Sequence, residues 1–313
     1  MRRYLLQKLL SLIPVLLGIS LAAFTLGVLS PGNPAELALA QGGFEPTPEQ
    51  IEAMEKQMGL DAPYPVQYLR WVGRALCGDL GVSYHSRRPV LDDLLRCLPV
   101  TLKVAGFSML LTCVIGISLG CAAAAFRDRW PDRLVSAYIN INLSFPAFWL
   151  ALLLILLFAE TLHWLPTSGN GGLRYLLLPG LVLSSASAAT AARLTRSALL
   201  AEFGKQYFTA AQARTASRWR LVVRNALPNA LSPTVALLGN SLGGMLGGSV
   251  IIESIFALPG IGSYALDAIT NRDYPALQGY VLLAGCTYVA VTLLVDIVGM
   301  LLNPKVRMGG RTI

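Results

Sequence analysis

The chain has 313 residues, of which 54% are hydrophobic and only 13% are charged, and its mean hydropathy is +0.57. This composition excludes a disordered or collagen-like chain and a soluble globular one. Uncharged runs long enough to cross a bilayer recur along the sequence, and their leucine-rich, non-alternating character predicts helices rather than a barrel. The expected fold class is an all-α polytopic membrane protein.

Six uncharged stretches reach or slightly exceed the length of a membrane span, which is about 17–25 residues. In chain order they cover residues 9–29, 104–126, 134–159, 175–192, 225–252 and 274–295. The first follows Arg2, Arg3 and Lys8, as a signal peptide would. Its apolar run is too long for a signal peptide and ends without a cleavage site, so we interpret it as a retained span.

The net charge of +8 is distributed unevenly between the segments that join the spans. With the N-terminus in the cytoplasm, the inside segments hold sixteen basic and three acidic residues, and all other segments hold nine basic and fourteen acidic ones. The positive-inside rule therefore predicts an N-in, C-in protein with six transmembrane helices. A nucleic-acid partner, which needs a soluble basic surface, is not supported.

This topology divides the chain into four parts. They are an N-terminal segment with the first span (1–30), an external subdomain (31–98), a transmembrane core (99–303) and a cytoplasmic tail (304–313). In the external subdomain, Thr47 as N-cap, Pro48 at the first position and Gly59 as the stop predict a helix over 48–58. The core contains a cytoplasmic loop at 204–228 and, at 253–273, an apolar segment that is broken by Pro and Gly and expected to be an external re-entrant hairpin.

The sequence shows no site for a catalytic group, a metal or a cofactor. The five cysteines lack metal-binding spacing, and a disulfide between Cys77 and Cys97 stays open. The two histidines, His85 and His163, are interpreted as surface or interfacial residues. No phosphate-binding loop of the Gly-x-x-x-x-Gly-Lys type occurs, so the chain is not expected to hydrolyse ATP by that device itself.

Polar groups within the spans mark candidate functional positions, because they are costly in hydrocarbon. The third span carries Asn140, Asn142 and Ser144 before Pro146. These groups either line a pathway or join helices by hydrogen bonds, and both interpretations stay open. Asp296, near the inner end of the last span, is interpreted as paired with a neighbouring helix rather than as a proton relay.

The fifth span is rich in glycine and forms three overlapping Gly-xxx-Gly pairs. The glycines are Gly239, Gly243, Gly244, Gly247 and Gly248. Such spacing predicts a helix-packing surface where backbones approach closely. The pattern leaves open whether the partner is another span of this chain or a second subunit.

The loop between the fourth and fifth spans contains a predicted basic amphipathic helix, a short break and a second segment that leads back into the membrane. Alanines at 210, 211 and 213 beside arginines favour a helix that packs closely on another protein. A membrane-surface helix held by anionic lipid is the alternative.

The order of these motifs resembles permease subunits of binding-protein-dependent ABC importers. Thr209-Ala210-Ala211, then Thr215, then Leu227-Pro228 match the spacing of the cytoplasmic EAA loop, although Thr209 and Thr215 replace its usual acid and glycine. Segments similar to the first permease of the dipeptide, oligopeptide and nickel class lie at 31–34, 58–68, 78–83, 88–90, 145–149, 255–262 and 271–275. Residues 88–95, 127–132 and 164–172 are most similar to nickel-import permeases.

The resemblance implies a type I ABC importer fold in the bacterial inner membrane. The implied partners are a second homologous permease, two cytoplasmic ATPase subunits that hold ATP and Mg, an external substrate-binding protein and membrane lipid. It also implies that the loop couples the permease to the ATPases, through Thr209, Ala210, Ala211, Ala213, Thr215, Leu227 and Pro228. The chain itself would be a non-catalytic subunit without a cofactor.

The function implied is a translocation pathway for nickel, free or chelated. A permease for dipeptides, oligopeptides or other metal chelates shares most of these motifs and is the alternative. A stand-alone secondary transporter or channel would need ion-coupling groups and perhaps an internal repeat, but ionisable residues such as Asp296 and Glu160 are scarce in the spans. A membrane-embedded enzyme would need facing His, Asp or Glu side chains, and the sequence has only two histidines.

Overall fold

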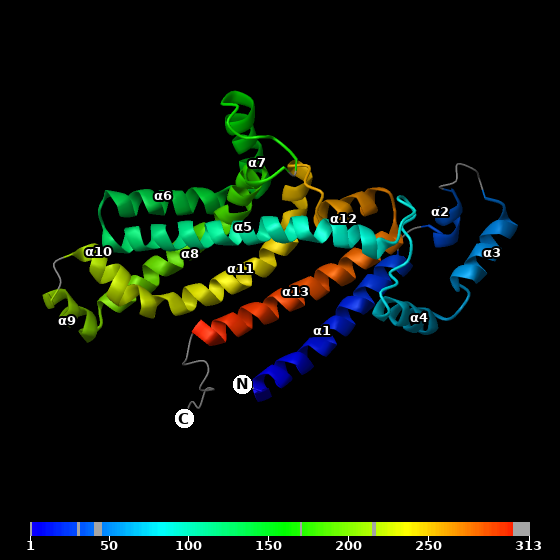
Figure 1. The fold of residues 1–313 in the computed structure, drawn as a ribbon, viewed down its shortest axis with the longest axis horizontal. Helices are drawn as coiled ribbons and strands as arrows, with labels where there is room; N and C mark the ends of the chain where they lie inside the picture. The colour runs from blue at the N-terminus through cyan, green and yellow to red at the C-terminus, as the bar shows by residue number, and fades with distance from the viewer. Residues whose placement is uncertain (1, 30–31, 41–45, 170, 215–216, 303–313) are drawn as a thin grey trace. The chain divides into compact units, whose positions relative to one another are not determined.

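The structure is a computed structural model that describes residues 2–29, 32–40, 46–169, 171–214 and 217–302. The chain forms two compact units, unit 1 from Met1–Val100 and Pro259–Val289, and unit 2 from Thr101–Leu258 and Ala290–Ile313. Throughout the described ranges the regular structure is helical, apart from an isolated bridge between Val82 and Pro89 (Figure 1). The predicted all-α class is therefore confirmed.

Four of the described helices are long and apolar enough to cross a membrane: α1 (Arg2–Leu29), α5 (Val90–Ala125), α8 (Leu173–Phe203) and α13 (Tyr274–Leu302). They contain the first, fourth and sixth predicted spans and all but the last residue of the second. Two more spans result if each of two bent helix pairs is counted as one. Six spans and the N-in, C-in orientation remain predictions.

The third predicted span is two helices rather than one. α6 (Trp130–Ser144) is followed by α7 (Ala147–Leu154) and the π-helical segment η1 (Ile155–Thr161), with a bend of 109° between the pair. Phe145 and Pro146 at the bend have extended ψ angles of 137° and 141°. The cause is Pro146, whose ring disfavours helical geometry at the residue before it. In Figure 1, α7 rises away from α6 and α8 of the same unit.

Unit 1 begins with α1 and three shorter helices, α2 (Pro34–Ala40), α3 (Pro48–Met58) and α4 (Tyr64–Leu76). The prediction of α3 is confirmed at both ends. The Thr47 hydroxyl accepts a hydrogen bond from the Gln50 backbone N–H, the Gln50 side chain accepts one from the Thr47 N–H, and Gly59 ends the helix at a φ of 69°.

α4 packs on α1 through polar and aromatic contacts. The hydroxyl oxygens of Ser20 and Tyr68 lie 2.7 Å apart, and the rings of Phe24 and Tyr68 meet edge to face with centroids 5.5 Å apart. The C-terminal part of the chain completes this unit with α12 (Ile261–Thr270), so the segment 253–273 contains a ten-residue helix between its turns. Ile261 and Ala268 of α12 share a core with Leu94 of α5.

Unit 2 is arranged around α8, against which α6, α7 and α11 (Leu227–Ile255) pack. α5 approaches α8 so closely that a Cβ atom on Gly116 would lie 2.7 Å from the Ala191 Cβ, and one on Gly120 would lie 2.6 Å from the Thr195 Cβ. Glycines four residues apart allow this approach of two helix backbones. This α5–α8 contact was not predicted.

Candidate functional site

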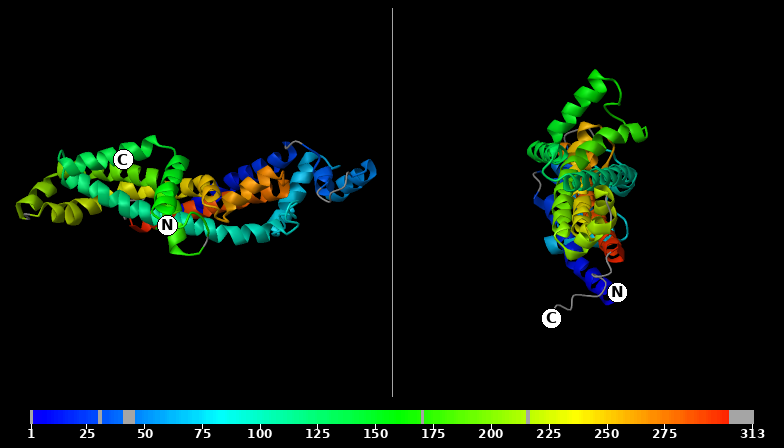
Figure 2. Two further views of the ribbon diagram at one scale, coloured as in Figure 1. Left: turned by 90° about the horizontal axis from the view of Figure 1, so that it is seen from above. Right: turned by 90° about the vertical axis from the view of Figure 1, so that its left-hand side faces the viewer.

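The loop predicted to couple the permease to its ATPases joins α8 to α11. It contains α9 (Gln206–Arg214), α10 (Arg218–Arg220) and the π-helical segment η2 (Leu221–Ala226), which lie at one end of unit 2 (Figure 2). The helix predicted in this loop corresponds to α9, and the second segment is helical as well. Thr215, one of the predicted coupling residues, lies outside the described residues.

One face of α9 is anchored in a hydrophobic core cluster of unit 2. Phe208 is buried there with Leu199 of α8 and Val222 of η2, and its ring stacks on that of Phe203 with centroids 4.6 Å apart. Ala211, one turn further along α9, packs against the same cluster. This alanine is partly buried against its own subunit, and its docking role stays a prediction.

The other face of α9 is open. Thr209, Ala210, Gln212 and Ala213 are exposed. Of the two remaining predicted residues, Leu227 packs on the core cluster and Pro228 is exposed. The described part of the predicted set thus divides into two packed residues, Ala211 and Leu227, and four exposed ones, Thr209, Ala210, Ala213 and Pro228. We call the exposed side of α9 the α9 outer face (Thr209, Ala210, Gln212 and Ala213).

A group of hydrogen-bonded side chains, which we call the polar clasp (Glu202, Lys205, Tyr207 and Asn229), holds the start of α9. The Glu202 carboxylate, 8% exposed near the end of α8, accepts hydrogen bonds from Lys205 Nζ and Tyr207 Oη, both at 2.6 Å. Tyr207 Oη also accepts one from Asn229 of α11, at 3.3 Å. The hydrogen bond with Glu202 raises the pKa of Lys205, and burial together with that carboxylate raises the pKa of Tyr207. The clasp ties α9 to both α8 and α11.

A partly buried ion pair joins α6 to α8. Asp132, 4% exposed, accepts two hydrogen bonds from the Arg196 guanidinium at 2.7 and 2.8 Å and a third from the Asp128 backbone N–H at 3.0 Å. Such bidentate geometry fixes the register of two helices. Sequence reasoning missed this pair, because two opposite charges 64 residues apart carry no signal of contact.

The predicted pathway residues lie around the bend between α6 and α7. Asn140, Ser144 and Pro146 are exposed, and Asn142 is half-buried. The Asn142 amide donates to the Tyr138 carbonyl at 2.9 Å and the Ser144 hydroxyl to the Asn140 carbonyl at 2.8 Å. These bonds lie within α6, so they do not join it to another helix.

The glycines of α11 whose surroundings the structure describes do not form one packed seam. Gly243 is buried, and a Cβ on Gly239 would meet the Val295 side chain of α13. Gly244 and Gly247 are exposed and have open space where a Cβ would stand. The environment of Gly248 lies outside the described side chains.

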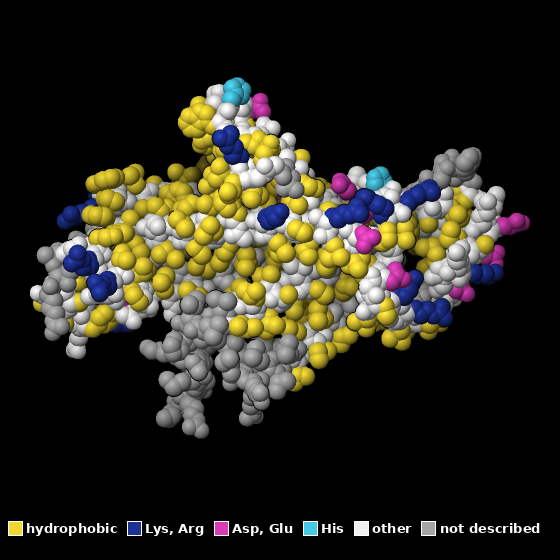
Figure 3. Space-filling view, in the orientation of Figure 1, with side chains coloured by type: hydrophobic (Ala, Val, Ile, Leu, Met, Phe, Trp, Pro, Cys, Tyr) yellow, Lys and Arg dark blue, Asp and Glu magenta, His cyan; other side chains and the backbone are white. Residues whose placement is uncertain are grey.

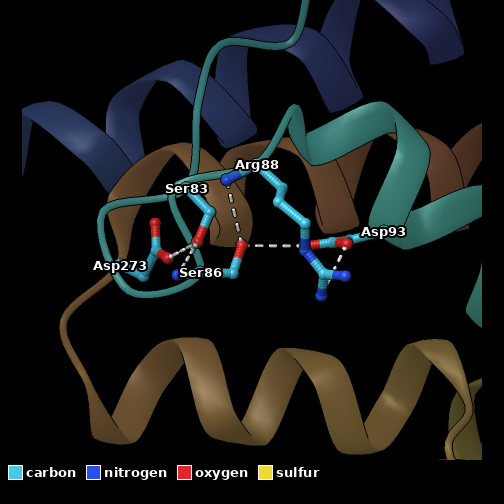
Figure 4. Close-up of polar contacts among 5 residues, drawn as sticks. All are labelled: Ser83, Ser86, Arg88, Asp93 and Asp273. Atoms are coloured by element: carbon cyan, nitrogen blue, oxygen red, sulfur yellow. Dashed lines mark hydrogen bonds and ion pairs between the residues drawn. The ribbon is translucent and has the colours of Figure 1, made fainter.

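Unit 1 carries a buried polar cluster between the 82–89 loop and the start of α13 (Figure 4). The Asp273 carboxylate, 2% exposed, accepts hydrogen bonds from Ser83 Oγ at 2.5 Å and from the backbone N–H groups of His85 and Ala276 at 3.2 Å each. The bond from Ala276 makes Asp273 the N-terminal cap of α13. The cluster thereby joins two segments 190 residues apart.

A second carboxylate extends this cluster. Asp93 accepts from the Ser86 hydroxyl at 2.8 Å and pairs with Arg88 at 3.1 Å. The adjoining cavity of about 250 Å³ is also lined by Tyr264. Burial, followed by the nearby Asp273 charge, raises the pKa of Tyr264, and burial raises that of Tyr84 to about 12.

The remaining candidates show no metal or disulfide chemistry in the described chain. Cys77 and Cys97 are separate thiols. Among the residues that the structure describes, no group of three or more His, Cys, Asp or Glu could hold a metal ion. His163 Nδ1 lies 2.9 Å from the Ala159 carbonyl oxygen, Glu160 is exposed, and the Asp296 side chain lies outside the described set.

Comparison with protein families matches two parts of the chain. The family described as "Binding-protein-dependent transport system inner membrane component" matches residues 116–308, and its N-terminal counterpart matches residues 1–105. The "Glutathione transport system permease protein GsiC" of Salmonella paratyphi A is 38% identical over 98% of this chain and 99% of its own. The protein of that name from Escherichia coli K12 is 37% identical over the same shares.

Among solved structures, the inward-facing MetNI methionine ABC transporter is similar in fold. The match has a TM-score of 0.58 at 22% identity and covers 67% of this chain and 96% of that one. At this identity the likeness concerns the fold alone.

Proposed function

The chain belongs to the family of binding-protein-dependent transport system inner membrane components and is a permease subunit of an ABC importer, and we propose that its cargo is a short peptide of the glutathione kind. The observation that carries this proposal is the 38% identity, over nearly the full length of both chains, with a permease named for glutathione transport. The nickel cargo expected from sequence motifs has no support among these relatives. The alternative, a peptide permease, is better supported.

Uptake by the complete importer tests the cargo. The permease is reconstituted in proteoliposomes with its partner subunits and binding protein, and ATP-dependent uptake of radiolabelled glutathione, a dipeptide and nickel is measured. We expect glutathione or the dipeptide to accumulate and to compete with each other, and nickel to do neither. Uptake of nickel alone would overturn the proposal.

Membership of this family implies a partner ATPase and a substrate-binding protein. We propose further that two ATPase subunits, which hold ATP and Mg, act on this chain and a second homologous permease. ATP binding then favours the outward-facing arrangement by more than the free permeases disfavour it. The permease selects and conducts the cargo without covalent chemistry.

Coupling to the ATPase is assigned to the α9 outer face. Small side chains at Ala210 and Ala213 permit close approach of another helix or groove, while Phe208 and Ala211 hold α9 on its own subunit. Ala213→Trp should therefore lower co-purification of the ATPase and uptake, without loss of the permease itself. Ala53→Trp is the matched control, because Ala53 is an exposed helical alanine of the predicted external subdomain. Equal assembly and uptake in both variants would refute docking at this face.

The pathway and the second permease are assigned to the surfaces that this chain leaves open. Asn140 and Ser144 present polar groups at the bend between α6 and α7, which suits weak contacts with a polar cargo. Gly244 and Gly247 leave room for a partner helix. Gly247→Leu should weaken co-purification with the second permease, and unchanged pairing would show that these glycines face lipid.

A further inference from the structure

The segment between α9 and α11 exposes two apolar and two basic side chains in a regular pattern. Trp219 and Val223 are 49% and 38% exposed, and Arg220 and Arg224 are also exposed. Each pair has the spacing of four residues that places side chains on one side of a helical segment. We call these four residues the Trp–Arg surface.

The opposite side of the same segment fixes its orientation. Leu221, Val222 and Ala226 are at most 5% exposed and belong to the core cluster that also holds Phe208. Because these three side chains anchor the segment to unit 2, the Trp–Arg surface must face outward. The Trp–Arg surface is therefore exposed because the opposite side of the segment is packed in the core, and not because the helix end is loose.

The sequence that carries this surface is basic, and the nearest preceding acid, Glu202, is bonded to Lys205. From residue 203 to residue 252 the sequence contains five basic residues and no acidic one. On the face drawn in Figure 3, Lys and Arg side chains but no Asp or Glu are visible over α9 and α10. Such a surface suits an anionic partner.

Its position in the chain indicates which anionic partner. A bent helix pair that is long and apolar enough to cross a membrane when counted as one span begins at Leu221, inside the segment that carries the surface. Tryptophan is enriched where a span meets the headgroups, and arginine at span ends reaches lipid phosphates. Trp219 and Arg220 directly precede Leu221, where the apolar helix pair begins, whereas the α9 outer face lies further toward the N-terminus.

We propose that the Trp–Arg surface binds anionic lipid headgroups of the cytoplasmic leaflet. The indole of Trp219 and the Val223 side chain enter the headgroup layer, and the guanidinium groups of Arg220 and Arg224 donate hydrogen bonds to lipid phosphates. This contact holds the segment between α9 and α11 at the membrane surface. The inference uses the predicted orientation but neither the cargo nor the ATPase assignment.

Quenching by brominated lipid tests the contact directly. The permease is placed in phosphatidylcholine nanodiscs that contain a rising fraction of brominated phosphatidylglycerol, and fluorescence of Trp219 is taken as the difference between the native chain and Trp219→Phe. We expect quenching at low phosphatidylglycerol fractions. Replacing Arg220 and Arg224 by Gln should raise the fraction needed for half-quenching by about fivefold for each arginine.

Two matched variants keep this result interpretable. Replacing Arg70 and Arg74 by Gln removes an exposed basic pair of the same spacing from α4, and should leave the quenching unchanged. Replacing Arg220 and Arg224 by Lys keeps the charge and should restore most of the binding. Circular dichroism of each variant checks that it is folded.

Three outcomes would overturn the proposal. The first is equal quenching of Trp219 by brominated phosphatidylcholine, and the second is no effect of the Arg→Gln pair. The third is loss of ATPase co-purification by that pair with quenching unchanged, which would assign the surface to an acidic protein partner. None of these outcomes bears on peptide uptake or on the α9 outer face.

Discussion

Gly120→Ala is expected to destabilise the contact between α5 and α8. The added Cβ would lie 2.6 Å from the Cβ of Thr195 and 2.8 Å from the carbonyl oxygen of Ala192, whereas carbon atoms normally approach to about 3.5–4.0 Å. Because the Ala192 oxygen belongs to the backbone, it cannot rotate away, and the helices must separate by nearly 1 Å. Overpacking of this kind costs about 1–3 kcal/mol.

The same helix supplies the control. Gly106 of α5 is exposed and has open space where a Cβ would stand, so Gly106→Ala should change the free energy of unfolding by no more than about 1 kcal/mol, in the stabilising direction. Unfolding of the purified permease in mixed micelles, followed by circular dichroism, compares the two variants. Equal stability of Gly106→Ala and Gly120→Ala would refute close approach of α5 and α8.

Three further predictions concern the polar groups. Ser83→Ala removes a donor from buried Asp273 and should destabilise unit 1 by about 1–3 kcal/mol in thermal unfolding, and an unchanged midpoint would contradict the burial described. Tyr207→Phe removes the hydrogen bond to Glu202 and should lower the number of cargo molecules moved per ATP hydrolysed, with assembly of the complex retained. An unchanged ratio of cargo to ATP would rule out a role of this bond in coupling. Burial raises the pKa of Tyr84 to about 12, so its contribution to stability is complete below about pH 10 and is lost as the pH rises toward 12. Tyr84→Phe should remove that part of the alkaline transition in pH-dependent unfolding, and an unaltered transition would refute this contribution.

The features that the sequence predicts correctly depend on residues that are close together in the chain. The helix α3 depends on Thr47, Gln50 and Gly59, which act within a few residues of one another, and both ends form as expected. The bend at Phe145 also has a local cause, because Pro146 disfavours helical geometry at the residue before it. The stretch 134–159 is uncharged throughout, so hydropathy alone predicts one continuous span there. Hydropathy reports the length of an apolar run and is insensitive to its direction.

The sequence predicts a helix in the cytoplasmic loop but not which side of that helix is exposed. The alanine pattern marked α9, yet whether Ala211 or Ala213 faces outward depends on where Phe208 enters the core, which is a matter of tertiary packing. Gly116 and Gly120 form a Gly-xxx-Gly pair in the sequence, but the denser glycines of α11 carry the stronger packing signal. The contact of Ser83 with Asp273 joins distant segments and has no local signal.

Unit 1 is built from both ends of the chain, and this imposes an order on its synthesis. Its first hundred residues are made long before Pro259–Val289, and the 158 residues of unit 2 between them must be made first. At about 5–20 residues per second, Ser83 and the apolar side of α5 near Leu94 wait roughly 10–40 s for Asp273 and α12. During that interval the Ser83 hydroxyl lacks its Asp273 partner and Leu94 lacks the half of its core that Ile261, Ala268 and Ala276 supply, so unit 1 cannot complete its packing until late in synthesis.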